Sequence, residues 1–129
     1  MDDFHERRLT FCQLTRLPGD IIEIIPDEGV EIDLVMVEEL EAVLVAAMGA
    51  SFAMLVNKVN SYSVTFEAQM KIGLLQGVQA TAVVVYSSAG EMGTEQIKAM
   101  TDGEEKTIDI FFERSQAVSW LEEKMAARP

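Results

Sequence analysis

The polar stretch at residues 60–63 carries the residue types best suited to recognition. It follows an apolar run at residues 51–58, typical of a strand covered on both faces, and precedes a predicted helix at residues 64–76. Open α/β sheets place ligand sites at strand carboxyl ends, and a helix start stabilises a phosphate. The candidates for partner binding or phosphorylation are Asn60, Ser61, Tyr62 and Ser63. The structural alternative is that Asn60 or Ser63 caps the helix and Tyr62 packs on the sheet edge.

Catalysis lacks a base that the fold would hold. His5 is the only histidine, and it lies in residues 1–7, which we expect to be frayed. A Ser–His or Cys–His pair requires a positioned base. Cys12 is expected to be a small apolar strand residue. Acid–base work by carboxylates would require two acids in one deep pocket. We therefore expect no catalytic residue and predict that the protein is not an enzyme.

Metal and cofactor motifs are missing from the sequence. One cysteine and one histidine leave no CxxC pair and no His/Cys cluster, so no metal ligand is expected. The serines and glycines of residues 87–93 could cradle an anion, but they lack the lysine and spacing of a P-loop. We expect an ordinary loop there and no cofactor.

The charge balance excludes some partners. The chain of 129 residues has 22 acidic and 10 basic residues, a formal net charge of −12, which would repel nucleic acid or an anionic membrane. The acidic surface either maintains solubility or docks a basic partner. No segment reads as a secretory signal or a membrane span, so the expected location is cytoplasmic. The length suits a single domain over residues 1–129.

Alternating strands and helices must position the polar stretch. The pattern predicts strands at residues 9–17, 21–25, 51–58, 80–86 and 108–112. It predicts helices at residues 34–48, 64–76 and 94–100 and from residue 115, with Asp33 and Ser115 as N-caps. This β-β-α-β-α-β-α-β-α order predicts an α/β fold with a mainly parallel sheet, an antiparallel first strand and helices packed on the sheet.

Helical periodicity predicts which side chains face the core. The core positions expected on the three longer helices are Met36, Leu40, Val43, Leu44 and Ala47, then Phe66, Met70, Gly73 and Leu74, then Ala117, Val118, Leu121 and Met125. Four apolar residues fall outside these stripes: Leu34, Val45, Ile72 and Leu75. They are either scattered surface side chains or a patch for a partner or a homodimer.

Two short segments carry a family resemblance. One is residues 59–63, between the third strand and the second helix, and the other keeps an F-x4-A-x2-W-L spacing from Phe112 to Leu121. With the element order, they make the chain resemble the uncharacterised bacterial branch of the SpoIIAA-like family, which shares its fold with STAS domains. In anti-sigma-factor antagonists of this fold, a partner kinase phosphorylates a serine at the start of the helix. Here Asn60 precedes Ser61, where those proteins have an Asp-Ser pair.

Two functions from different classes follow. The resemblance implies a non-catalytic regulatory or protein-interaction module with a protein partner, docking through residues 60–63 and the start of the next helix. The alternative is a carrier of a small molecule or lipid, because apolar helices over a sheet can enclose a cavity. Its expected lining is Met36, Leu40, Phe66 and Met70.

Overall fold

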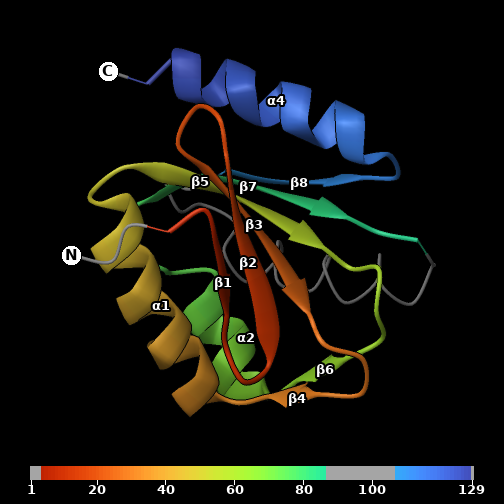
Figure 1. The fold of residues 1–129 in the computed structure, drawn as a ribbon. Coiled ribbons are helices and arrows are strands. Elements are labelled where there is room, and N and C mark those ends of the chain that lie inside the picture. Colours follow the sequence, from red (N-terminus) through yellow and green to blue (C-terminus); the bar gives the residue numbers. More distant parts are fainter. Residues whose placement is uncertain (1–3, 87–106, 129) are drawn as a thin grey trace.

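A computed structural model describes residues 4–86 and 107–128. Its strands are β1 (Glu6–Arg8), β2 (Cys12–Leu17), β3 (Ile21–Pro26), β4 (Glu31–Ile32), β5 (Phe52–Asn57), β6 (Ser63–Val64), β7 (Val78–Val84) and β8 (Thr107–Phe111). Its helices are α1 (Leu34–Met48), α2 (Phe66–Ile72) and α4 (Arg114–Ala126). The central sheet has the order β1-β2-β3-β5-β7-β8, and β4 and β6 form a small second sheet. α1 and α2 cover one face of the central sheet, and α4 covers the other (Figure 1).

The strand directions confirm the predicted fold class. β1, β2 and β3 are antiparallel neighbours, whereas β3, β5, β7 and β8 run parallel. A parallel neighbour is reached by a crossover connection, which α1 supplies between β3 and β5 and α2 supplies between β5 and β7. The carboxyl ends of the parallel strands therefore meet at one edge of the sheet.

The N-terminal segment differs from the prediction. Residues 1–7 were expected to be frayed, but Glu6 and Arg7 belong to β1, which pairs with Thr15 and Leu14 of β2. The carbonyl of His5 also accepts a hydrogen bond from the Arg16 amide at 2.8 Å. For Glu6 and Arg7 the expectation is wrong, because edge strands tolerate charged side chains and a polar sequence does not by itself indicate a free end.

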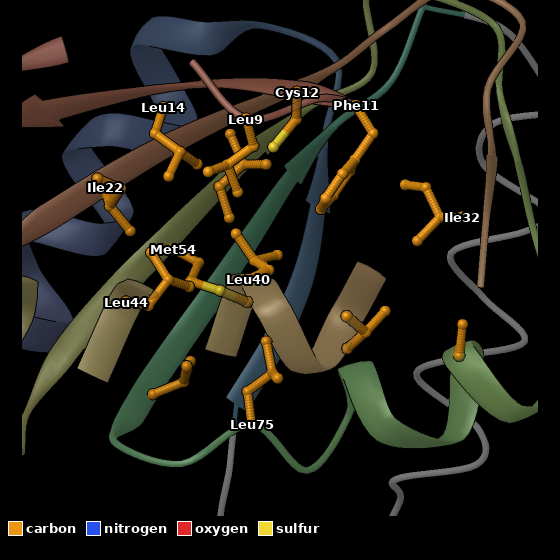
Figure 2. Close-up of a cluster of buried hydrophobic side chains, with 14 of the residues drawn as sticks. Leu9, Phe11, Cys12, Leu14, Ile22, Ile32, Leu40, Leu44, Met54 and Leu75 are labelled. Atoms are coloured by element: carbon orange, nitrogen blue, oxygen red, sulfur yellow. The ribbon is translucent and has the colours of Figure 1, made fainter. Parts of the chain in front are cut away.

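Two apolar layers sandwich the central sheet. On the α1 side, buried strand residues such as Leu14, Ile22 and Met54 point toward Leu40 and Leu44 (Figure 2). On the α4 side, the alternate strand residues pack against that helix: Ile21, Ala53, Leu55, Ala80, Ala82 and Val84. Because successive side chains of a strand point to opposite faces, a strand buried on both faces has a continuous apolar sequence. The predicted strands at residues 51–58 and 80–86 are thus confirmed as β5 and β7.

α1 follows the prediction closely. The carboxylate of Asp33 accepts a hydrogen bond from the Met36 amide at 3.0 Å and caps the helix. Leu40 and Leu44 are buried, and Met36 and Val43 pack against the same core. The capping residue and the inward face were both readable because the helix is long enough for its periodicity to repeat.

α2 presents the opposite face to the one predicted. Phe66 is 65% exposed, Met70 48% and Leu74 49%, although all three were expected in the core. The inward residues of the helix are Ala68 and Ile72, and just after its end Leu75 is buried, as is Gly73, the one residue of the predicted face that does lie inside. Both faces of this segment carry apolar residues, so periodicity cannot choose between them. The short helix spans only residues 66–72, and its direction out of β6 decides which face turns inward.

The predicted apolar patch is therefore divided. Leu34 and Val45 are exposed at 37% and 36%, whereas Leu75 is only 2% exposed and Ile72 packs against the core. The prediction is wrong for Ile72 and Leu75, because the reversal of α2 places them under the helix. The four residues do not form one surface.

α4 begins one residue before its predicted cap. Its N-cap is Glu113, which makes no capping hydrogen bond through its side chain, so the prediction of Ser115 is wrong. Arg114 is held by Glu23 of β3, which draws the helix start toward the sheet. The inward face is as predicted, with Ala117, Leu121 and Met125 buried. The predicted loop at residues 87–93 and the helix at residues 94–100 lie outside the described residues.

Candidate functional site

The predicted recognition loop is fastened to the turn after β3. The Asn60 side-chain amide donates a hydrogen bond to the carbonyl of Pro26 at 3.0 Å, and the Ser61 amide donates to the Glu28 carboxylate at 3.1 Å. The Gly29 amide donates to the Ser61 carbonyl at 2.7 Å. These contacts fix the loop backbone and leave the side chains of Ser61 and Ser63 exposed.

The loop does not cap α2. Thr65 is the N-cap, and its hydroxyl accepts a hydrogen bond from the Ala68 amide at 3.2 Å. The expectation that Asn60 or Ser63 fills this role is wrong, because Ser63 lies in β6 and pairs with Glu31. Tyr62 packs against the hydrophobic core, where burial raises the pKa of its phenol.

The electrostatics around Ser61 disfavour a second negative charge. Its backbone amide already donates to the Glu28 carboxylate. A phosphoryl group on Ser61 would add charge beside that acid, where like charges repel. The helix-start stabilisation expected from the sequence also weakens, since Ser61 lies before β6 and four residues ahead of the Thr65 cap.

An apolar cavity of about 80 Å³ lies between the central sheet and the elements that cover its α1 side. Sheet residues on its wall include Ile24, Met54, Val56 and Val83. Opposite them are Ile32, Val37, Leu40, Tyr62, Val64, Ile72 and Leu75. Of the four residues predicted to line a carrier cavity, Leu40 does so. Phe66 and Met70 point to solvent instead, because α2 is turned the other way.

Few polar groups reach this cavity. Among the residues that the structure describes, they are Cys12, Lys58, Tyr62 and Thr81. Burial raises the pKa of the Cys12 thiol to about 12, so the group stays neutral, in agreement with its predicted role as a small apolar residue. The Lys58 ammonium lies 5.5 Å from the centre of the Tyr62 ring. Burial lowers the pKa of this ammonium group. Sequence patterning missed Lys58, although a lysine that closes a buried apolar run is a usable signal.

A polar cluster lies on the opposite face of the sheet, under the start of α4. Glu23 is 6% exposed and accepts two hydrogen bonds from the Arg114 guanidinium, at 2.9 and 2.8 Å. The Asn57 side-chain amide donates to the same carboxylate at 3.0 Å. The Arg114 contact, followed by the Asn57 contact, holds the pKa of Glu23 below its usual value. Because the carboxylate is charged and fully paired, this cluster joins β3, β5 and α4.

Metal clusters and membrane spans are both absent from the described residues. Within residues 4–86 and 107–128, no group of three or more His, Cys, Asp or Glu side chains is placed to hold a metal ion. No helix in these two ranges is long and apolar enough to cross a membrane.

Comparison with known proteins supports the fold. No protein-family model matches the sequence, and no curated protein matches it. The structure is similar to the crystal structure of an uncharacterised protein of the DUF3478 family from Shewanella loihica PV-4, described as having a SpoIIAA-like fold. The TM-score is 0.59 at 16% sequence identity, over 85% of this chain and 91% of that chain. The expected SpoIIAA-like fold is therefore confirmed, and the likeness extends to the fold alone.

Proposed function

We propose that this protein is a non-catalytic binding module that takes up a small apolar molecule in the cavity beneath α1 and α2. The observation that carries the proposal is the cavity itself. Protein interiors are normally packed to crystal-like density, and an apolar void costs stability unless something fills it. About 80 Å³ is several times what one water needs but less than the ~150 Å³ that holds benzene. The site therefore suits a small molecule or the end of a short chain.

The position of the cavity supports a binding role. It reaches from the middle of the sheet toward the carboxyl ends of β3 and β5, where Pro26 and Lys58 lie on its wall. Ligands of open α/β sheets bind at this edge. We also propose that the protein is cytoplasmic, as expected from its sequence.

Filling the cavity tests the proposal. Val83 of β7 lines the cavity, whereas its neighbour Val84 faces α4 and is fully buried. Val83→Ile is expected to raise the free energy of unfolding by up to about 1 kcal/mol and to weaken binding of a probe small enough for this volume, such as xenon or cyclopropane, several-fold. Methyl NMR shifts of the lining residues, titrated with the probe, measure the binding.

Val84→Ile is the matched control, because it adds the same methylene on the other face. It is expected to cost about 1 kcal/mol through overpacking and to leave probe binding unchanged. Wild-type protein in which no lining methyl responds to millimolar probe would contradict the proposed function. Native mass spectrometry of freshly purified protein would show whether a ligand is already bound.

A second candidate is a protein-interaction module, and the exposed apolar side chains of α2 favour it. Phe66 begins this helix just after β6 and the Thr65 cap and is 65% exposed, and Met70 of the helix and Leu74 just beyond its end are also exposed. α1 and α2 begin close together because they follow the paired strands β4 and β6, which adds Leu34 and Val35 to this end of the molecule. Apolar surface of this kind marks contact with a partner. Asn60, Ser61, Tyr62 and Ser63 belong to the proposed contact region.

Self-association is the accessible test of the second candidate. If a homodimer forms through this surface, Phe66→Asp is expected to raise its dissociation constant at least about tenfold, since a buried aromatic anchor is lost. Sedimentation velocity over a concentration series measures the effect. Phe112→Asp is the control, because Phe112 is exposed to a similar degree, 62%, on another segment. Equal effects of the two substitutions on the dissociation constant would contradict a homodimer through this surface. A wild-type chain that stays monomeric would contradict it as well.

A further inference from the structure

α1 carries more apolar surface than its place in the fold requires. Twelve of its fifteen residues are apolar and the other three are glutamates, so the helix has no basic residue. Its buried residues are Val37, Leu40 and Leu44. On the opposite side, Val35 is 72% exposed, the highest value among the large apolar side chains of the described residues. A helix that packs on one side only normally turns a polar face to water, whereas α1 turns an apolar one.

Two glutamates border this outward apolar surface. Successive residues of a helix are about 100° apart around its axis, so Glu38 and Glu39 are separated by that angle. The arc between them holds Val35, Ala42 and Ala46. All five residues are exposed, and we call them the α1 strip. The strip follows the helix for about 17 Å, or three turns, with apolar side chains in the middle and an acid on each side.

The charges of the α1 strip select among possible occupants. A symmetric contact between two copies of the chain would gather four glutamates in one interface, and α1 offers no cation to offset them. An anionic membrane would be repelled by the same acids and by the net charge of −12. A helix with an apolar stripe bordered by Lys or Arg complements both parts of the strip. Charged side chains that flank an apolar seam select the partner in the same way in coiled coils.

We propose that the α1 strip docks an amphipathic, basic helix of a partner protein. The apolar stripe of that helix lies over the valine and the two alanines of the strip, and its Lys or Arg side chains lie beside Glu38 and Glu39. The small alanine side chains let the two helices approach closely. This inference goes beyond the proposed function, because Val37 and Leu40 line the cavity from the inward side of the same helix.

Two synthetic helical peptides of about 18 residues test the proposed charge selection. Both carry leucines along one stripe, and the remaining positions are mainly lysine in the basic peptide and glutamate in the acidic one. The basic peptide is expected to bind the wild-type protein at least about tenfold more tightly than the acidic peptide at physiological salt, because opposite charges at the rim favour one partner and like charges exclude the other. Fluorescence anisotropy of the labelled peptides measures both affinities.

Ala42→Arg locates the binding on the α1 strip. It puts a long cationic side chain in the middle of the apolar part and is expected to weaken binding of the basic peptide about tenfold or more. Arginine forms helices nearly as well as alanine and would lie one turn from Glu38 and Glu39, so the fold is expected to persist. Ala126→Arg is the matched control, since Ala126 is exposed at the end of α4, on the other face of the sheet. It adds the same charge and is expected to leave the affinity within about threefold of wild type.

Several results would overturn the proposal. Equal affinities for the two peptides would do so, and equal losses in the two variants would show general attraction to an acidic chain. A wild-type dimer that Ala42→Arg dissociates in sedimentation velocity would assign the strip to a second copy. Binding to vesicles of neutral phosphatidylcholine that the same variant abolishes would assign the strip to a lipid surface.

NMR of the wild-type protein decides even if Ala42→Arg fails to fold. Amide shifts caused by the basic peptide must centre on residues 35–46 of α1. Shifts confined to α2 would place the peptide on the surface of the second candidate function and overturn the proposal. The cavity function is tested separately by the small apolar probe, so either of the two can fail without the other.

Discussion

Replacing Arg114 by Met is expected to lower the free energy of unfolding by about 3 kcal/mol at neutral pH. The substitution leaves the Glu23 carboxylate, which is 6% exposed, with the Asn57 amide as its remaining described partner. Removing one partner from a buried ion pair costs about 3–5 kcal/mol, and the value here lies at the lower end because the Arg114 side chain is 44% exposed. Urea denaturation followed by the fluorescence of Trp120 measures the loss.

The same pair sets part of the acid sensitivity of the protein. The pKa of Glu23 is lower in the folded state than its ordinary value of about 4.3. The pair therefore stabilises the wild type fully above about pH 4.3, and this stabilisation is lost as the pH falls through the folded pKa. Without Arg114, burial favours the protonated carboxyl. The gap between wild type and Arg114→Met is thus expected to be widest at neutral pH and to narrow below about pH 4.

Arg128→Met is the control for this prediction, because it also removes an arginine from the C-terminal part of the chain. Arg128 pairs with Asp20, which is 49% exposed, at 2.7 Å. An exposed pair contributes about 0–1 kcal/mol, and Arg128 also donates hydrogen bonds to the Ser51 carbonyl and hydroxyl at 3.1 and 3.2 Å, so a loss of about 1–2 kcal/mol with little dependence on pH is expected. Equal losses for the two variants at pH 7 would contradict the role given to Glu23.

Gly77→Ala is expected to destabilise the fold by about 2–4 kcal/mol. Gly77 has a φ of +87°, a conformation that side chains with a Cβ rarely adopt. An added Cβ would lie 2.9 Å from Cε1 of the buried Phe52 ring and 3.2 Å from the Gly49 carbonyl oxygen. Backbone and a packed ring both resist displacement, so strain adds to the conformational cost. Thermal and urea unfolding measure the change.

Gly29→Ala separates the conformational cost of the positive φ from the strain caused by the added Cβ. Gly29 has a φ of +78°, but an added Cβ would meet nothing within 4 Å. Only the conformational cost of about 1 kcal/mol is expected there. A loss at Gly77 no larger than that at Gly29 would show that the space around Gly77 accommodates a methyl group.

Local sequence patterns predicted those elements that local forces determine. The buried strands β5 and β7, the Asp33 cap and the inward face of α4 follow from apolar runs and periodicity within a few residues. The prediction of the buried face of α2 was wrong because both faces of this helix are apolar. The direction of the chain leaving β6 determines which face is buried. The sequence did not predict β1, because its residues are polar and only its pairing with β2 identifies it as a strand.

The candidate sites depend on contacts between distant parts of the chain. Glu23 meets Asn57 across 34 residues and Arg114 across 91, and no short motif encodes such a cluster. A glutamate within the β-branched strand Ile21–Pro26 was nevertheless a usable signal, since a buried acid requires a partner. The cavity had no signal of its own, because it arises from how the α1 and α2 side chains fill the space over the sheet.

The link between β3 and α4 also bears on how the chain is made. Arg114 is synthesised 91 residues after Glu23. At a synthesis rate of about 5–20 residues per second, the interval between the two residues is about 5–18 s. During that interval the layer under α1 and α2 can assemble from segments already synthesised. The opposite face, with Ile21, Ala53 and Leu55, stays uncovered until α4 emerges. A nascent chain thus exposes one apolar sheet face, with the Glu23 carboxylate still lacking its Arg114 partner, until α4 has been synthesised.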